Sequence, residues 1–299
     1  MPQKPSSYDD PLNQEAPADA ALTDITRDPD PTTDENSDAD SFQAVLTGDF
    51  ARGLMLLSRV PWSFPSNVSF QAACIARSVW CWPLIGVLLS GVAVLPALMV
   101  AWLTGNGALA ALGAIVAMVL LTGSLHEDGI ADCADGFGGG TTREKKLAIM
   151  RDSRIGSYGV VALALVFAAR ILLLTQAFDA GIFMTTLLLA AMFSRLAIPV
   201  LMIVLRPARP DGLGRGAGRP GMVPFLVALW IVIGGAMILG GAVMMLACLL
   251  AVAVACLVVG KTAQWQIGGQ SGDVLGSVQI IAEIFVMIAI ISVTIRVAG

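Results

Sequence analysis

Three aspartates have the type and spacing needed for metal-assisted chemistry. Asp128, Asp132 and Asp135 follow one another at intervals of four and three residues, so a helix would carry all three carboxylates on one face. Like charges this close repel one another unless a cation lies among them, and carboxylate oxygens suit Mg²⁺, Mn²⁺ or Ca²⁺. Asp152, further along the chain, could join them. The sequence therefore predicts a divalent metal site on these four residues.

The residues that follow are those that usually accompany phosphate. Gly138 and Gly139 belong to a glycine run that lacks the lysine and serine of a nucleotide-binding P-loop. This run predicts either exposed backbone N–H groups that face a phosphate or a plain flexible turn. Next, Thr141 and Glu144 form a capping box, which predicts a short helix that ends at about Met150.

Two arginines and a histidine complete this charged segment. Arg151 and Arg154 flank Asp152, where they could clamp a diphosphate or simply mark a cytoplasmic loop. His126 is the only histidine of the chain. It could transfer a proton or contact a phosphate beside the carboxylates, or it could be a hydrogen-bonded structural residue. The whole segment predicts a site for a phosphorylated substrate.

The elements that must position this segment are strongly apolar. Hydrophobic residues make up 56% of the chain and charged residues 13%, whereas soluble domains average about 25% charged residues. Several apolar runs reach the roughly 20 residues that a spanning helix needs. These values exclude a soluble globular protein and predict an all-α, polytopic integral membrane helical bundle. The five cysteines form no CxxC pair, so neither a disulfide nor a zinc site is implied.

The apolar runs predict about seven transmembrane helices. Residues 48–61, which are too short and too charged to span, predict an amphipathic interfacial helix instead. Lys and Arg concentrate in alternate connections, which places those loops and the N-terminus in the cytoplasm and the C-terminus in the periplasm. The predicted spans are residues 83–103, 107–125, 159–178, 182–205, 222–239, 242–260 and 277–296.

Two predicted spans carry arginines. A charge in lipid costs at least about 2.5–3.5 kcal/mol, so Arg170 and Arg195 should face the bundle interior and pair with an acid or a phosphate. Glu283, in the last span, is a candidate partner. Asp273 precedes that span on the cytoplasmic side, where it could bind metal or substrate or could cap the helix.

The first 45 residues differ sharply from the rest. They hold eleven acids against Lys4 and Arg27, a balance of −9 that leaves +5 for the remainder of a chain whose net charge is −4. We expect residues 1–45 to be a disordered acidic tail and residues 46–299 to be a single membrane-embedded domain. The tail lacks the pattern of a secretion signal. The mildly basic remainder suits anionic substrates and lipid headgroups, and we expect no nucleic-acid partner.

At these residues the sequence resembles the cobalamin synthase family, the adenosylcobinamide-GDP ribazoletransferases. The pattern His-x-Asp-Gly-x-x-Asp-x-x-Asp-Gly begins at His126, and Met-Arg-Asp-Ser-Arg-x-Gly-x-Tyr-Gly ends at Gly159. The resemblance continues through Ser194-Arg195 and the segment Gly272-Asp273-x-Leu275-Gly276 to Glu283, and covers about residue 48 onward.

The resemblance implies a Mg²⁺-dependent enzyme of the cell inner membrane that completes vitamin B12 with its active site on the cytoplasmic face. It would join adenosylcobinamide-GDP to α-ribazole or its 5′-phosphate and release GMP. Membrane lipid and other B12-assembly enzymes are the implied partners. Asp128, Asp132 and Asp135 would act in catalysis, and one of them or His126 would accept a proton. The implied substrate-binding residues are Gly138, Gly139, Arg151, Arg154, Arg195, Asp273 and Glu283.

Two other readings compete with this one. Asp132-x-x-Asp135-Gly136 matches the start of the CDP-alcohol phosphotransferase motif, but the Ala-Arg step that should follow is missing. A transporter or channel would place Arg170, Arg195 and Glu283 along its path, and would predict weak internal repeats that the sequence does not show.

Overall fold

The computed structural model describes residues 32–60, 70–209 and 216–298, and the chain divides into two units, residues 1–45 and 46–299. Residues 1–31 of the predicted acidic tail lie outside the described residues. Residues 32–45, for which we also predict disorder, form the first part of helix α1 (Thr32–Leu57).

Within the described residues, helices are the only regular secondary structure of the second unit, and one isolated bridge joins Pro207 and Gln270. This confirms the all-α class. After α1 the elements are α2 (Ala72–Ser78), the 3₁₀ helix η1 (Val79–Cys81), α3 (Trp82–Thr104), α4 (Gly107–Thr122), α5 (Leu125–Gly139), α6 (Arg143–Ile149), α7 (Ser157–Asp179), α8 (Phe183–Val204), α10 (Met222–Ile267) and α11 (Gly272–Ala298).

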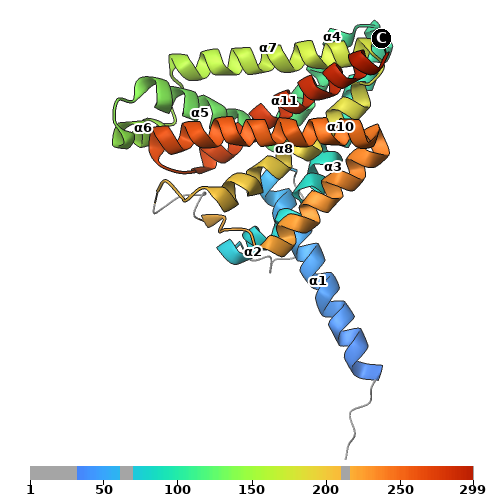
Figure 1. Cartoon of the computed structure of the whole chain (residues 1–299), viewed down its shortest axis with the longest axis vertical. Helices are drawn as coiled ribbons and strands as arrows, with labels where there is room; N and C mark the ends of the chain where they lie inside the picture. The colour runs from blue at the N-terminus through green and yellow to red at the C-terminus, as the bar shows by residue number, and fades with distance from the viewer. Residues whose placement is uncertain (1–31, 61–69, 210–215, 299) are drawn as a thin grey trace, which may run out of the picture. The chain divides into compact units, whose positions relative to one another are not determined.

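In the part of the chain that the structure describes, five helices are long and apolar enough to cross a membrane, or six if the bent pair α4–α5 counts as one span. The chain is therefore a multi-pass membrane protein. Helix α10 contains two of the predicted spans, and it breaks at Gly241, whose φ of 74° and ψ of −177° are not helical. Figure 1 shows the two halves of α10 diverging from this break. Seven crossings and the orientation of the termini stay predictions.

The connection between α4 and α5 turns the chain sharply. Gly123 and Ser124 both have positive φ values, 65° and 59°, and the two helices meet at 89°. Glycine adopts this conformation without strain, whereas a serine does so only rarely. A side chain on Gly123 would also overlap Arg59. The bend therefore ends the predicted span 107–125 and directs the acidic helix α5 away from the axis of α4.

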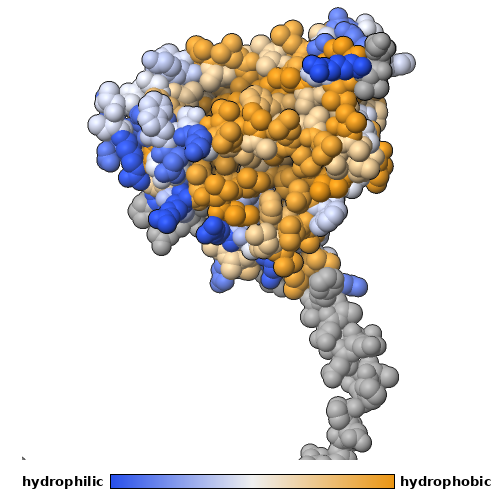
Figure 2. Space-filling view, in the orientation of Figure 1, coloured by the Kyte–Doolittle hydropathy of each residue, from blue (hydrophilic) through white to orange (hydrophobic). Residues whose placement is uncertain are grey.

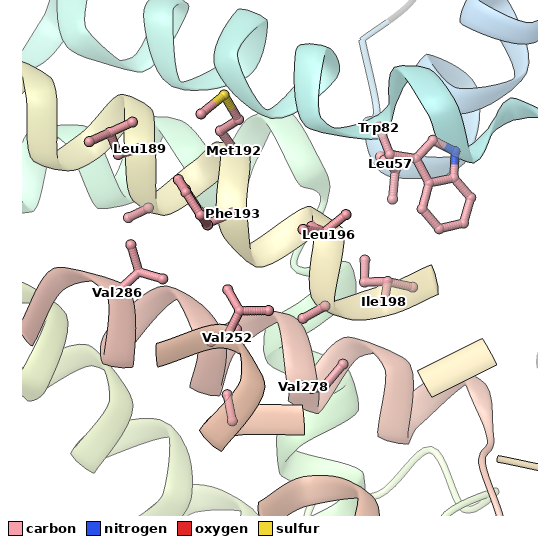
Figure 3. Close-up of a cluster of buried hydrophobic side chains, with 14 of the residues drawn as sticks. Leu57, Trp82, Leu189, Met192, Phe193, Leu196, Ile198, Val252, Val278 and Val286 are labelled. Atoms are coloured by element: carbon pink, nitrogen blue, oxygen red, sulfur yellow. The ribbon is translucent and has the colours of Figure 1, made fainter. Parts of the chain in front are cut away.

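Helix α11 forms the centre of the bundle and packs against α8, α10 and α5. Figure 3 shows Phe193 and Leu196 of α8 directed toward Val252 of α10 and toward Val278 and Val286 of α11. All five side chains are buried, and each fully buried aliphatic or aromatic side chain contributes about 1.5–3 kcal/mol by leaving water. This core fixes where α11 begins, and therefore where its first polar turn lies.

The outer surface of the second unit is largely apolar. Trp102, Ile238 and Trp265 are more than four-fifths exposed, as expected for side chains that face lipid. Figure 2 shows hydrophobic residues across the middle of the visible face and hydrophilic residues at the left, where Figure 1 places α6 and the neighbouring end of α5. The charged segment identified in the sequence therefore lies at one end of the bundle.

A buried acid ties the end of α1 to α2 and η1. Asp49 is 1% exposed and accepts hydrogen bonds from Arg77 Nε and Nη2 at 2.9–3.0 Å, from Trp80 Nε1 at 3.2 Å, and from Arg52. The predicted interfacial helix thus has a buried polar face as well as the buried Leu54. Its position at the membrane surface stays a prediction.

Replacing Asp49 should destabilise the protein. We expect Asp49→Ala to lower the free energy of unfolding by about 2–4 kcal/mol, because Arg52 and Trp80 would lose a buried acceptor. Thermal unfolding in detergent measures the effect. The matched control is Glu144→Gln, since Glu144 is an exposed acid on α6. Equal melting temperatures for the two variants would contradict this role of Asp49.

Candidate active site

Two of the three aspartates lie together as the spacing predicts. Helix α5 carries Asp128 and Asp132 on one face, and both line a polar cavity of about 450 Å³. We call this space the acidic cavity. Arg151 and Asp152 line it from the loop between α6 and α7, and Glu127 lines it from α5. The structure thus brings together four of the predicted site residues.

The acidic cavity concentrates negative charge. The pKa of Asp132 is raised to about 7, first by partial burial and then by the neighbouring negative charges of Asp128 and Asp273. Asp273 lies in the first turn of α11, so two helices contribute carboxylates to the same region. A cation that binds beside such a carboxyl group would favour its ionised form and offset the repulsion from the neighbouring carboxylates.

Asp135 has a different environment. It is 8% exposed, and its two carboxylate oxygens accept hydrogen bonds from the backbone N–H groups of Gly156, at 2.7 Å, and Gly159, at 2.9 Å. These N–H groups belong to the start of α7 and would otherwise lack a partner. Asp135 therefore caps α7 from α5, and it does not line the acidic cavity.

The contact between Asp135 and α7 requires glycine. A Cβ atom on Gly159 would lie 2.4 Å from Asp135 Oδ2. We expect Gly159→Ala to displace this carboxylate and to lower stability by about 1–3 kcal/mol, with a loss of activity because α5 shifts. The control is Gly234→Ala, where a Cβ would meet nothing within 4 Å. Thermal unfolding of both variants decides, and unchanged stability of Gly159→Ala would refute the contact.

The loop across the acidic cavity contains an exposed ion pair. Arg154 donates from Nε and Nη2 to the carboxylate of Asp152, with the Nη2 distance 2.7 Å. These hydrogen bonds lower the pKa of Asp152. Asp152 and Arg151 line the cavity, whereas Arg154 does not. Among the described residues, no three His, Cys, Asp or Glu side chains are arranged so that they alone could hold a metal ion.

The glycine run does not form the loop that its composition predicts. Helix α5 continues through Gly139, and the N–H of Gly140 bonds to Gly136 at 3.1 Å. Gly138 makes room for the ring of Tyr158, which would lie 2.7 Å from an added Cβ. The expectation of an open loop is wrong here because close packing against α7 requires residues without side chains. The cap of α6 is likewise Thr142, whose side chain accepts from Lys145 N, and not Thr141.

A buried charge network holds α5, α7 and α11 together. Arg170 donates to Glu127 at 2.8 Å and to Glu283 at 2.9 Å, and all three side chains are buried. Gln279 donates to Glu283 and to Ser194, each at 3.0 Å, which extends the network to α8. The prediction that Arg170 pairs with an acid inside the bundle is confirmed. Glu283 lies in this interior and not on the acidic cavity.

Arg195 and His126 are buried in the interior and do not line the acidic cavity. Arg195 is fully buried, and its Nη1 donates to Ala191 O at 2.9 Å while its Nε and Nη2 lack hydrogen-bond partners among the described residues. Gly86 of α3 leaves the space that the Arg195 side chain occupies. His126 is 3% exposed and lines a second, apolar cavity on another side of α5. Neither residue reaches the acidic cavity.

Three residues of this region were not predicted as site residues. Glu127 and Arg170 position α5, and Arg209 lies beside Asp273, with Nη2 3.6 Å from its Oδ2. Arg209 also donates to Leu147 O at 3.2 Å. In the sequence, Arg209 is one of several basic residues in its connection and nothing distinguishes it. Arg170 was identified in the sequence as a charge inside an apolar run that requires a buried partner, although not as a site residue.

Comparison with known proteins identifies the family of this chain. The family model for cobalamin-5-phosphate synthase matches residues 49–291. An adenosylcobinamide-GDP ribazoletransferase of Bradyrhizobium diazoefficiens is 42% identical over 219 residues, which cover 72% of this chain and 82% of the relative. One of Mesorhizobium japonicum is 38% identical, covering 81% and 92%. No solved structure matches the chain. The acidic cavity therefore lies in a member of the cobalamin-5-phosphate synthase family, to which this chain belongs.

Proposed function

We propose that the chain joins adenosylcobinamide-GDP to α-ribazole or its 5′-phosphate, giving adenosylcobalamin or its phosphate and GMP. The observation that carries this proposal is the pair Asp128 and Asp132 in one polar cavity, faced by Arg151, in a chain of this family. The relatives are named adenosylcobinamide-GDP ribazoletransferases, and the chain matches most of their length.

The residues of the acidic cavity fit a magnesium ion. Mg²⁺ is usually held by one or two carboxylates together with water and substrate phosphates, and seldom by a cage of protein ligands. Asp128 and Asp132 supply such a pair, and Asp273 adds negative charge beside them. Asp135 is a weaker candidate because it caps α7. When bound, the ion would neutralise the diphosphate and the leaving group.

The protein groups then have distinct tasks. A ribose hydroxyl of the acceptor forms a bond to the phosphorus that carries the cobinamide arm, and the bond from that phosphorus to GMP breaks. Asp128 or Asp132 would accept the hydroxyl proton, whereas His126 faces another cavity. Arg151 lines the acidic cavity, where fixed positive charge would stabilise the charge that develops on the phosphate oxygens.

We place this reaction on the cytoplasmic face of the cell inner membrane. The loop between α6 and α7, which carries Arg151 and Arg154, lies at the hydrophilic end of the bundle at the left of Figures 1 and 2, and basic loops favour the cytoplasmic side. The cytoplasm also supplies nucleotides and phosphorylated intermediates. Membrane lipid surrounds the apolar surface, and other B12-assembly enzymes are the proposed protein partners.

The experiment is direct. Purified protein in detergent is mixed with adenosylcobinamide-GDP, α-ribazole and Mg²⁺, and GMP is measured by chromatography. We expect GMP release that requires the acceptor and is abolished by EDTA and restored by Mg²⁺. A CDP-alcohol phosphotransferase would instead release CMP from a CDP-alcohol, and a transporter would release neither nucleotide. The family match argues against both alternatives.

A further inference from the structure

A second cavity lies beside the acidic one. It has a volume of about 320 Å³ and mostly apolar walls, with Trp82, Met202 and Leu275 among them. We call it the apolar cavity. Its volume falls at the lower end of the range of about 300–1,000 Å³ that small-molecule sites occupy. The space therefore suits a ligand the size of a nucleoside and not the macrocycle of the donor.

One polar atom interrupts these apolar walls. His126 lines the apolar cavity, its side chain is buried, and its Nε2 lacks a hydrogen-bond partner among the described residues. A buried polar atom without a partner is costly, so such atoms usually mark a place that water or a ligand occupies. A single polar group in an apolar pocket typically fixes the orientation of a ligand.

The first turns of α5 and α11 lie between the two cavities. Gly272 lines the apolar cavity, while the next residue, Asp273, interacts electrostatically with Asp128 and Asp132 of the acidic cavity. The first turn of α5 divides in the same way, because His126 lines the apolar cavity and Glu127 lines the acidic one. A ligand held in the apolar cavity therefore lies next to the carboxylates.

We propose that the apolar cavity binds the aromatic base of the acceptor nucleoside, with His126 Nε2 as its hydrogen-bond partner. The inference rests on the proposed function, since ribazole is the acceptor in that reaction. Ribazole carries a benzimidazole base, which is flat, largely apolar and able to form hydrogen bonds at its polar edge. The Trp82 ring offers it an aromatic wall. A lipid acyl chain would fill the cavity but leave His126 unpaired.

Filling the cavity tests the proposal. Leu275 is buried and lines the apolar cavity, and Leu275→Trp would occupy part of it. Benzimidazole is the probe, and calorimetry measures its binding to the full chain in detergent without donor. We expect Leu275→Trp to weaken benzimidazole binding and to raise the KM for α-ribazole, each about tenfold or more, with the KM for adenosylcobinamide-GDP within about twofold.

The matched control is Ile288→Trp, which enlarges an exposed side chain further along α11, in a surface groove near its C-terminal end. It should change neither constant. If Leu275→Trp unfolds, His126→Phe serves instead, because it keeps a ring and removes the polar atom. We expect about tenfold weaker benzimidazole binding from that change.

Several results would overturn the proposal. Equal binding of benzimidazole to the folded Leu275→Trp variant and the wild type would do so, as would an effect only on the KM for the donor. Complete displacement of benzimidazole by phospholipid in nanodiscs would identify the apolar cavity as a lipid site. Absence of GMP release from the wild type would refute the proposed function, and it is recorded separately because benzimidazole binding needs neither donor nor turnover.

Discussion

Asp132→Asn should lower kcat for GMP release by about two to three orders of magnitude, the usual consequence of removing a group that stabilises charge in a transition state. The variant keeps the shape of the side chain but loses the charge that would hold a cation in the acidic cavity. Asp128→Asn should behave in the same way, because both carboxylates line that cavity. Single-turnover GMP release at saturating Mg²⁺ measures the effect.

The stability of the Asp132→Asn variant should change in the opposite direction. The folded protein raises the pKa of Asp132 to about 7 from 3.8, so the folded state binds this proton more tightly than the unfolded state. The contribution of this carboxyl to stability is therefore lost as the pH rises from about 4 to about 7. In the absence of metal at pH 8, the asparagine variant should melt at the same temperature as the wild type or higher.

The control for this pair of measurements is Asp179→Asn. Asp179 is an exposed acid at the far end of α7, so its loss should change neither activity nor melting temperature. Half or more of the wild-type activity in both the Asp128 and the Asp132 variants would refute the role of the acidic cavity. A large fall in melting temperature would instead assign these residues a structural role.

Arg170→Met should cause the largest loss of stability of any single change considered. It would leave Glu127 and Glu283 as buried carboxylates without their cation, and breaking a buried ion pair in this way costs about 3–5 kcal/mol. Because Glu127 adjoins Asp128 on α5, activity should fall together with stability. Thermal unfolding in detergent and yield of folded protein by size-exclusion chromatography measure the result.

A combined variant separates charge from packing. Replacing Arg170 by Met together with Glu127→Gln and Glu283→Gln removes all three charges, and should recover a substantial part of the lost stability. Lys261→Met removes an exposed cation from α10 and should have little effect. If the combined variant is no more stable than Arg170→Met alone, the loss comes from packing and not from unpaired charge.

Local patterns predicted much of the fold. Apolar runs indicated the helices α3, α4, α7, α8 and α11. The gap between the predicted spans 222–239 and 242–260 contains Gly241, where α10 breaks. The acidic segment is helical, and its i, i+4 pair shares a face as expected. These features depend on neighbours within one or two turns, which the sequence shows directly.

The remaining features depend on partners far along the chain. Asp135 looks like a third metal ligand until the start of α7 is placed against it, and the glycine run looks like a loop until Tyr158 packs on it. His126 and Asp128 are two residues apart, yet they line different cavities because neighbours on a helix point in different directions. Arg209 reaches Asp273 only through the folding of its connection.

The right-angle turn at Gly123 and Ser124 has a consequence for how the membrane takes part. If α4 crosses upright, α5 lies almost parallel to the bilayer surface, and its carboxylates stay level with the lipid headgroups. A bulky, hydrophilic donor can then bind from one compartment alone, and none of its charge has to enter the hydrocarbon core. The product is then released into the same compartment.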